Sequence, residues 1–159
     1  MKVRESTIDD EAAIAALNTL AFGSTAEAEI LRRLKRDNDD LISLVKCKGV
    51  DVIGHIQFYK ITSPDQEFIG LGPISVHPDF QRKGHGSELI RKGLLAVKAK
   101  SLTPLVFVQG HTGFYPKFGF SSARAAQFKA PWDGDAFMAL ELRTPAPRSG
   151  VLDFPKAFL

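Results

Sequence analysis

The chain has 159 residues, of which 44% are hydrophobic and 25% charged, and this composition predicts one globular domain over residues 1–159 rather than a disordered chain. Its formal net charge of +3 is small for a nucleic-acid-binding protein, which usually gathers many more cations on one face. No long apolar segment or apolar signal core is present in the sequence, so a cytoplasmic protein is expected, without a membrane partner.

The first part of the chain predicts a strand, two helices and a strand pair. Residues 2–5 are expected to form a short strand. Thr7 and the acidic residues after it are typical of a helix start, and a second helix is expected after Thr25. The first helix should pack through the apolar residues at helical spacing, namely Ile8, Ile14, Leu17, Leu20 and Ala21. Strands are expected at residues 41–46 and 52–62, and the single cysteine, Cys47, should be a buried apolar residue.

Residues 67–76 are expected to form the next strand, with an irregularity near its middle. This run contains Gly70, Gly72 and Pro73. Proline cannot donate a ladder hydrogen bond, so within a sheet it belongs at an edge or at a bulge.

A glycine-containing loop then leads into a helix predicted from Ser87 to Lys100. The first N–H groups of a helix have no intrahelical partner, and the helix dipole adds partial positive charge there. Glycine lacks a Cβ atom, so a ligand can approach the main chain closely at Gly84 and Gly86. Arg82 and Lys83 add two cations, and the segment therefore predicts a pyrophosphate site.

Several common sites do not fit this pattern. A Walker loop needs a lysine directly after the second glycine, and a Rossmann fingerprint needs a third glycine where Leu89 stands. Ser75 and Ser87 lack the context of a nucleophile elbow, and no histidine, cysteine or carboxylate spacing predicts a metal site. What remains is Gln-x-x-Gly-x-Gly, beginning at Gln81.

This pattern resembles the acetyl-CoA loop of the GCN5-related N-acetyltransferases, the GNAT superfamily. A second motif follows the buried-strand run at residues 104–108. It consists of Gly110-His111 and then Tyr115-Pro116-Lys117-Phe118-Gly119-Phe120, and it is similar to the Gly-His…Tyr-x-x-Phe-Gly-Phe motif of one uncharacterised bacterial branch. Residues 136–142 and 150–158 are also similar to that branch, so the resemblance covers almost the whole chain.

The resemblance implies an α/β fold with a mixed, strongly twisted sheet of six or seven strands and helices on both faces. In this fold the central strand pair splays at a bulge and leaves a wedge for the pantetheine arm of the cofactor. Gly72-Pro73 stands where that bulge is expected. Residues 145–159 would form an extended segment packed on the domain.

The implied function is that of an acetyl-CoA-dependent N-acetyltransferase, in which a primary amine attacks the thioester directly. Acetyl-CoA is the expected co-substrate, and no metal is expected. The residues implied to bind acetyl-CoA are Ile74, Ser75, Val76, Gln81, Arg82, Lys83, Gly84, His85, Gly86 and Ser87.

Two residues are candidates for the chemistry. Tyr115 matches the tyrosine that the family is proposed to use as general acid toward the leaving thiolate, although it could instead only pack against the pantetheine arm. Many relatives have a glutamate base on the central strand, but residues 68–76 contain no acid. His111 is therefore the candidate base, because a free imidazole titrates at about pH 6.5. His55, His77 and a water relay are the alternatives.

The sequence also allows two other functions. One is a non-catalytic acyl-CoA-binding sensor or regulatory module, and the other is a toxin-type acetyltransferase that acts on aminoacyl-tRNA. The expected acceptor is a small-molecule or peptide amine, with nucleic acid not expected as a partner. The sequence identifies neither the acceptor nor the acyl chain, and it allows a monomer or a homodimer.

Overall fold

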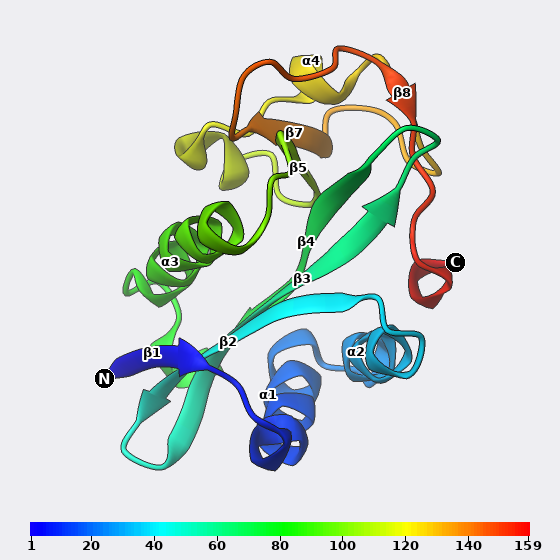
Figure 1. Ribbon diagram of the computed structural model, residues 1–159. Helices are drawn as coiled ribbons and strands as arrows, with labels where there is room; N and C mark the ends of the chain where they lie inside the picture. Colours follow the sequence, from blue (N-terminus) through cyan, green and yellow to red (C-terminus); the bar gives the residue numbers. More distant parts are fainter.

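The computed structural model describes residues 1–159, and six strands form one mixed sheet in the order β1-β2-β3-β4-β5-β7 (Figure 1). Neighbouring strands are antiparallel except β4 and β5, which are parallel. The strands are β1 (Lys2–Glu5), β2 (Asp40–Lys48), β3 (Asp51–Thr62), β4 (Glu67–Val76), β5 (Leu105–Gln109) and β7 (Phe137–Glu141). A separate pair is formed by β6 (Phe128–Lys129) and β8 (Gly150–Val151). This architecture confirms the predicted α/β class.

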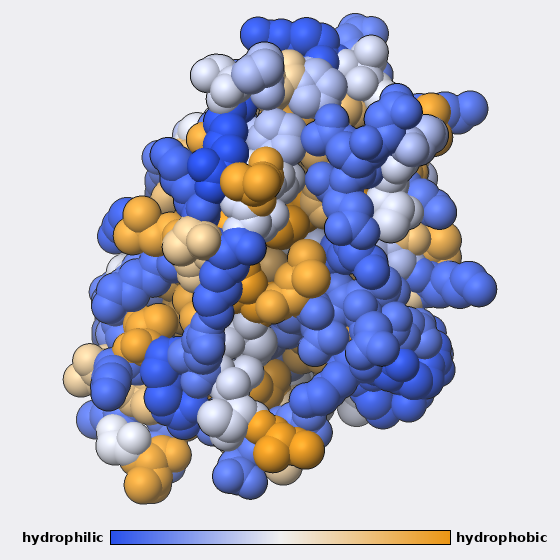
Figure 2. Space-filling view, in the orientation of Figure 1, coloured by the Kyte–Doolittle hydropathy of each residue, from blue (hydrophilic) through white to orange (hydrophobic).

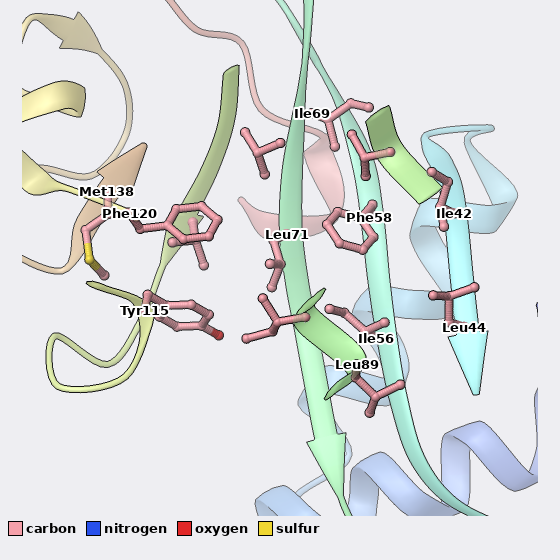
Figure 3. Packing of buried hydrophobic residues seen from close by; sticks show 14 residues of the cluster. Ile42, Leu44, Ile56, Phe58, Ile69, Leu71, Leu89, Tyr115, Phe120 and Met138 are labelled. Atoms are coloured by element: carbon pink, nitrogen blue, oxygen red, sulfur yellow. The ribbon is translucent and has the colours of Figure 1, made fainter. Parts of the chain in front are cut away.

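Helices cover both faces of the sheet. Figure 1 shows α1 (Glu11–Phe22) and α2 (Ala26–Arg36) on one face and α3 (His85–Lys100) on the other. Because side chains alternate along a strand, Ile56 and Phe58 of β3 pack with α3 (Figure 3). Tyr59 and Ile61 point to the other face and pack with Leu34 of α2. The short elements are η1 (Ile8–Asp10), η2 (Pro78–Phe80), η3 (Tyr115–Phe118), α4 (Ser122–Ala125) and η4 (Lys156–Phe158).

The predicted apolar face of the first helix is only partly correct. Ile14 and Leu17 are buried, but Ile8 is 74% exposed and Leu20 is 53% exposed. Ile8 lies in the η1 turn before the α-helix, so the helical spacing does not apply to it. The buried face of α1 includes Asn18 instead, a polar residue that the apolar pattern does not reveal.

The predicted bulge in β4 is present. Ile56 of β3 pairs with Ile74, and Phe58 pairs with Leu71, so Gln57 faces two residues of β4, Gly72 and Pro73. The extra residue changes which face of the sheet each later side chain of β4 occupies.

The parallel contact between β4 and β5 is short. It joins Ile69–Leu71 to Val106–Val108 and then ends, while β5 continues beside β7. The N–H of Gly110 donates to Ala136 O at 3.0 Å, which holds the end of β5 on the β7 side. Residues 72–76 of β4 therefore have a neighbour in β3 but none on their other edge, and this is the splayed central pair that was expected.

Helix α3 begins at His85, two residues earlier than predicted. Its first backbone hydrogen bond runs from Glu88 N to Gly84 O at 3.1 Å. Gly93, in the middle of the helix, allows close packing on the sheet, because a Cβ atom there would lie 2.6 Å from the Phe58 ring. The loop thus passes directly into a helix held against β3.

The last segment of the chain packs beside β3. Asp153 N donates to Thr62 O at 2.8 Å, and Leu152, Phe154 and Ala157 are buried with Tyr59.

Cys47 is free and buried, as predicted. None of the helices has the length and apolar character needed to cross a membrane.

Candidate functional site

The open edge of β4 presents main-chain groups of Ile74 and Val76. In an antiparallel ladder, alternate residues of a strand bond to the same neighbour. His77 N donates to Ile53 O of the strand β3 at 2.8 Å. By this alternation, the main chain of Ser75 also bonds toward β3, whereas Ile74 and Val76 face the opposite edge.

A side chain from the following loop supports this orientation. Gln81 Nε2 donates to Val76 O at 2.9 Å, so that carbonyl is directed away from β3. Gln81 thereby ties the loop to the end of the strand. Ser75 differs from its neighbours, because its hydroxyl is buried on the other face and has no hydrogen-bond partner in the chain.

The loop ends in a helix N-terminus with free donors. Gly84 has φ +87° and caps α3, so a side chain at this position would be strained. Because Glu88 is the first residue to donate within the helix, the N–H groups of His85, Gly86 and Ser87 have no intrahelical partner. Such donors, together with the helix dipole, favour an anion.

Cations lie on two sides of this helix start. Arg82 and Lys83 are exposed in the loop, and neither forms an ion pair. Beneath the helix lies Lys46 of β2, whose side chain is 6% exposed and donates to Glu88 Oε2 at 2.8 Å. This hydrogen bond lowers the pKa of Glu88. Sequence reasoning missed Lys46, and its only signal is a charged residue inside an apolar strand.

Gly86 is the point where three parts of the site meet. A Cβ atom at this position would lie 3.8 Å from Phe114 Cζ and 3.8 Å from Val76 Cγ2. The helix start therefore adjoins both the open end of β4 and the segment before η3. The structure thus brings the predicted strand, loop and tyrosine segments together.

Tyr115 is buried next to the segment that contacts Gly86. Its side chain is 5% exposed, and its ring lies against Gly110, where a Cβ atom would come within 2.6 Å of Cε2. Figure 3 shows its hydroxyl directed toward β4, and this hydroxyl forms no hydrogen bond within the chain. Burial raises the pKa of Tyr115 to about 12, so the phenol is protonated at neutral pH.

The candidate histidine bases differ in their surroundings. His111 is exposed after the end of β5, and its carbonyl accepts from Phe114 N and Tyr115 N, but its imidazole makes no hydrogen bond. The Nδ1 atom of His77 accepts from Asp79 N at 3.1 Å and caps the η2 turn. His77 is thus engaged in a local turn, whereas the His111 ring is free.

His55 lies in a buried chain of polar groups under α1. Its Nε2 atom is 3.1 Å from Ser43 Oγ, which accepts from Ser6 Oγ at 2.7 Å, and its Nδ1 atom is 3.4 Å from Asn18 Nδ2. Burial lowers the pKa of His55 to about 4, so the ring is neutral at pH 7. A cavity of about 1140 Å³ between α1, α2 and β2 reaches His55 and Ser43, but no residue of the phosphate loop lines it.

The comparisons with known proteins agree with this geometry. The model of the acetyltransferase (GNAT) family matches residues 11–120, which is more than half of the chain. The chain belongs to the GNAT acetyltransferase family. This membership confirms the predicted GNAT superfamily and the predicted enzyme class, an acyltransferase.

Relatives of this GNAT chain include two proteins of Escherichia coli K12. The uncharacterized N-acetyltransferase YjhQ is 33% identical over 119 residues, which cover 70% of this chain and 64% of YjhQ, somewhat under two thirds of its length. The uncharacterized N-acetyltransferase YhbS is 26% identical, and the alignment covers 99% of this chain and 98% of YhbS.

Two solved structures share the fold over nearly the whole chain. The Escherichia coli YhbS crystal structure, in complex with CoA, has a TM-score of 0.88 at 23% identity and covers 99% of this chain and 91% of that one. A GNAT acetyltransferase from Brucella melitensis, in complex with acetyl-CoA, has a TM-score of 0.83 at 28% identity. The match covers 99% of this chain and 97% of the Brucella chain. Both confirm the predicted GNAT-like fold.

The neutral state of His55 makes stability depend on pH. Because the ring has a pKa of about 4 in the folded chain and about 6.5 when unfolded, the unfolded chain gains the proton first as the pH falls. We expect the free energy of unfolding to decrease by about 2 kcal/mol between pH 7 and pH 5 from this group alone. Urea unfolding at the two pH values measures the free energy of unfolding. The variant His55→Gln should lose the part of its pH dependence that comes from His55. Equal stability of the unmodified protein at pH 7 and pH 5 would contradict the assignment.

Proposed function

We propose that this protein is an acetyl-CoA-dependent N-acetyltransferase that moves an acetyl group to a primary amine by direct attack. The observation that carries the proposal is the open edge of β4, which ends beside a helix N-terminus with free N–H donors at Gly86. The CoA and acetyl-CoA present in the two similar crystal structures support this choice of ligand.

The chain offers a separate partner for each part of acetyl-CoA. The amides of the pantetheine arm would bond to the free N–H and C=O of Ile74 and to the free N–H of Val76, as an added strand would. The pyrophosphate would accept from the N–H groups of His85, Gly86 and Ser87, with the cations Arg82 and Lys83 nearby. Ser75 and Gln81 would act indirectly, since Ser75 bonds toward β3 and Gln81 braces the loop.

Acetyl-CoA supplies the acetyl group on a thioester, and the protein positions the reactants and moves protons. We propose that Tyr115, which is protonated at neutral pH, donates its phenolic proton to the leaving sulfur. A primary amine arrives mostly as an ammonium ion and must lose a proton before it can attack. His111, exposed at the end of β5 with a free imidazole, is proposed to accept that proton.

The acceptor class proposed from the sequence is a small-molecule or peptide amine, and the location proposed is the cytoplasm. A panel of primary amines, including small amines and peptides with free N-termini or lysines, tests this by thiol release from acetyl-CoA. Release that requires the amine supports the function. Tight binding of acetyl-CoA with no release for any acceptor would favour the alternative, a non-catalytic acyl-CoA sensor.

Gly84→Val is expected to weaken acetyl-CoA binding by at least about tenfold, since it distorts a loop whose charged-group hydrogen bonds are each worth about 1.5–3 kcal/mol. Isothermal calorimetry measures the affinity. Gly134→Val is the matched control, because Gly134 has φ +83° and similarly open surroundings in a different loop. A folded Gly84→Val protein that binds as tightly as the control would show that the loop does not hold the pyrophosphate.

Tyr115→Phe is expected to lower kcat by ~10²-fold or more while leaving acetyl-CoA affinity nearly unchanged. The ring and its contacts with Gly110 remain, and only the proton donor is lost. Steady-state kinetics gives kcat, and calorimetry gives the affinity separately. An unchanged kcat with a raised KM for acetyl-CoA would instead assign Tyr115 a packing role.

His111→Ala is expected to remove an acidic limb from the pH profile of kcat/KM. A base acts only when it is neutral, so activity should fall as the pH decreases through its ionisation. The profile must be compared for both proteins with the same acceptor, because the amine also titrates. If the same limb persists in His111→Ala, the proton acceptor is another group or a water relay.

A further inference from the structure

One ion pair of this chain is buried beneath the proposed pyrophosphate site. Lys46 Nζ of β2 donates to Glu88 Oε2 at 2.8 Å, and only 6% of the Lys46 side chain is exposed. Figure 2 shows charged residues spread over the surface, with apolar residues among them. In the other ion pairs of the chain, apart from Arg124–Glu141, at least 32% of the side chain of the cation is exposed.

Stability does not explain a buried pair of this kind. The desolvation of an ammonium and a carboxylate offsets most of their attraction, so such a pair contributes little to folding. The chain nevertheless makes room for the lysine. Its partner across the strands is Gly54, where a Cβ atom would lie 3.4 Å from Lys46 Cβ and 2.9 Å from Leu89 Cδ1. A role in binding accounts for the pair better than a role in folding.

Glu88 lies directly after the three residues whose N–H groups would bind the pyrophosphate. Its own N–H is the first to bond within α3, to Gly84 O at 3.1 Å. A carboxylate in the first turn of a helix interacts favourably with the helix dipole, and it repels an anion at the same end. Without a partner, Glu88 would therefore oppose the binding of a phosphate group to this helix start.

Two lysines pair with Glu88, and they are not equivalent. Lys92 Nζ lies 3.3 Å from Glu88 Oε1, but 53% of the Lys92 side chain is exposed, so water and salt screen this pair. Lys46 is screened much less, because it is buried against the sheet. The charges also reach the loop: burial lowers the pKa of His85, the charge of Lys46 lowers it further, and the charge of Glu88 raises it.

We propose that Lys46 is a positioning residue of the acetyl-CoA site, which acts through Glu88 by neutralising its carboxylate at the start of α3. This inference rests on the proposed function, because it assigns a role at the same site to a residue that does not touch the ligand. Coulomb interactions are stronger at a protein surface than in bulk water, so one uncompensated charge beside the pyrophosphate matters. The pair lets Glu88 remain in the first turn without repelling the ligand.

The test measures CoA affinity by calorimetry in the unmodified protein and in three variants. Lys46→Met should bind CoA at least about tenfold more weakly, because Glu88 loses its buried partner. The double variant Lys46→Met, Glu88→Gln should recover most of that affinity, because the repelling charge is gone. Glu88→Gln alone should bind CoA at least as tightly as the unmodified protein. This last variant keeps the test decisive even if Lys46→Met does not fold.

The matched control is Arg124→Met, which breaks the other buried ion pair. The Arg124 side chain is 12% exposed and pairs with Glu141 of β7, at the opposite edge of the sheet from β1. This variant should keep its affinity for CoA, whatever stability it loses in urea unfolding. A loss of CoA affinity as large as that of Lys46→Met would show a general effect of broken ion pairs, and it would overturn the inference.

Salt separates a charge effect from a distorted helix start. Between about 0.1 M and about 1 M salt the Debye length falls from about 10 Å to about 3 Å, so the difference in affinity between Lys46→Met and the unmodified protein should shrink. A difference that does not change with salt, a double variant as weak as Lys46→Met, or weaker binding by Glu88→Gln would each contradict the role of Lys46. If the unmodified protein binds no CoA, the proposed function itself fails.

Discussion

The separation of β4 from β5 after Leu71 and Val108 is the constraint on which the rest of the site depends. Two strands that stayed paired would satisfy each other's main-chain groups and leave no opening between them. Because β5 follows β7 instead, the edge of β4 keeps the main-chain donor and acceptor of Ile74 and the N–H of Val76 free. The helix start at Gly86 and the ring of Tyr115 then occupy the two borders of that opening.

Charge is distributed unevenly around this opening. Tyr115 and His55 are both neutral at pH 7, and burial moves the pKa of each further from neutral pH, to about 12 for the phenol and about 4 for the imidazole. The interior beside β4 therefore holds uncharged polar groups. The cations lie outside it, in the phosphate loop and along α3, where they remain hydrated until an anion binds. The exception is Lys46, which is buried but paired with Glu88. This division suits a ligand with a neutral reacting end and a highly charged far end.

The features that could be predicted from sequence are those set by local backbone chemistry. Glycines before a helix identified the loop, because glycine allows backbone conformations and close approaches that other residues do not. Pro73 identified the bulge, because proline cannot donate a ladder hydrogen bond. The Lys46–Glu88 pair could not be found in this way, since it joins segments that are distant in the sequence. Ile8 was wrongly placed on the buried face because a helical pattern does not show where the first turn becomes a regular helix. The burial of Asn18 gives no apolar signal in the sequence. The roles of Tyr115 and His111 in catalysis remain predictions.

The bulge at Gly72-Pro73 also determines which face of the sheet each later side chain of β4 occupies. Side chains alternate between the two faces of a sheet, so one extra residue exchanges the faces for every later position. With the bulge, Ile74 packs toward the α3 core, and Ser75 lies beside His55 on the α1 face. A homologous chain shorter by one residue here would differ little by sequence alignment. It would nevertheless turn a serine into the apolar core and an isoleucine toward the buried imidazole, so insertions and deletions at this point should be far less tolerated than substitutions.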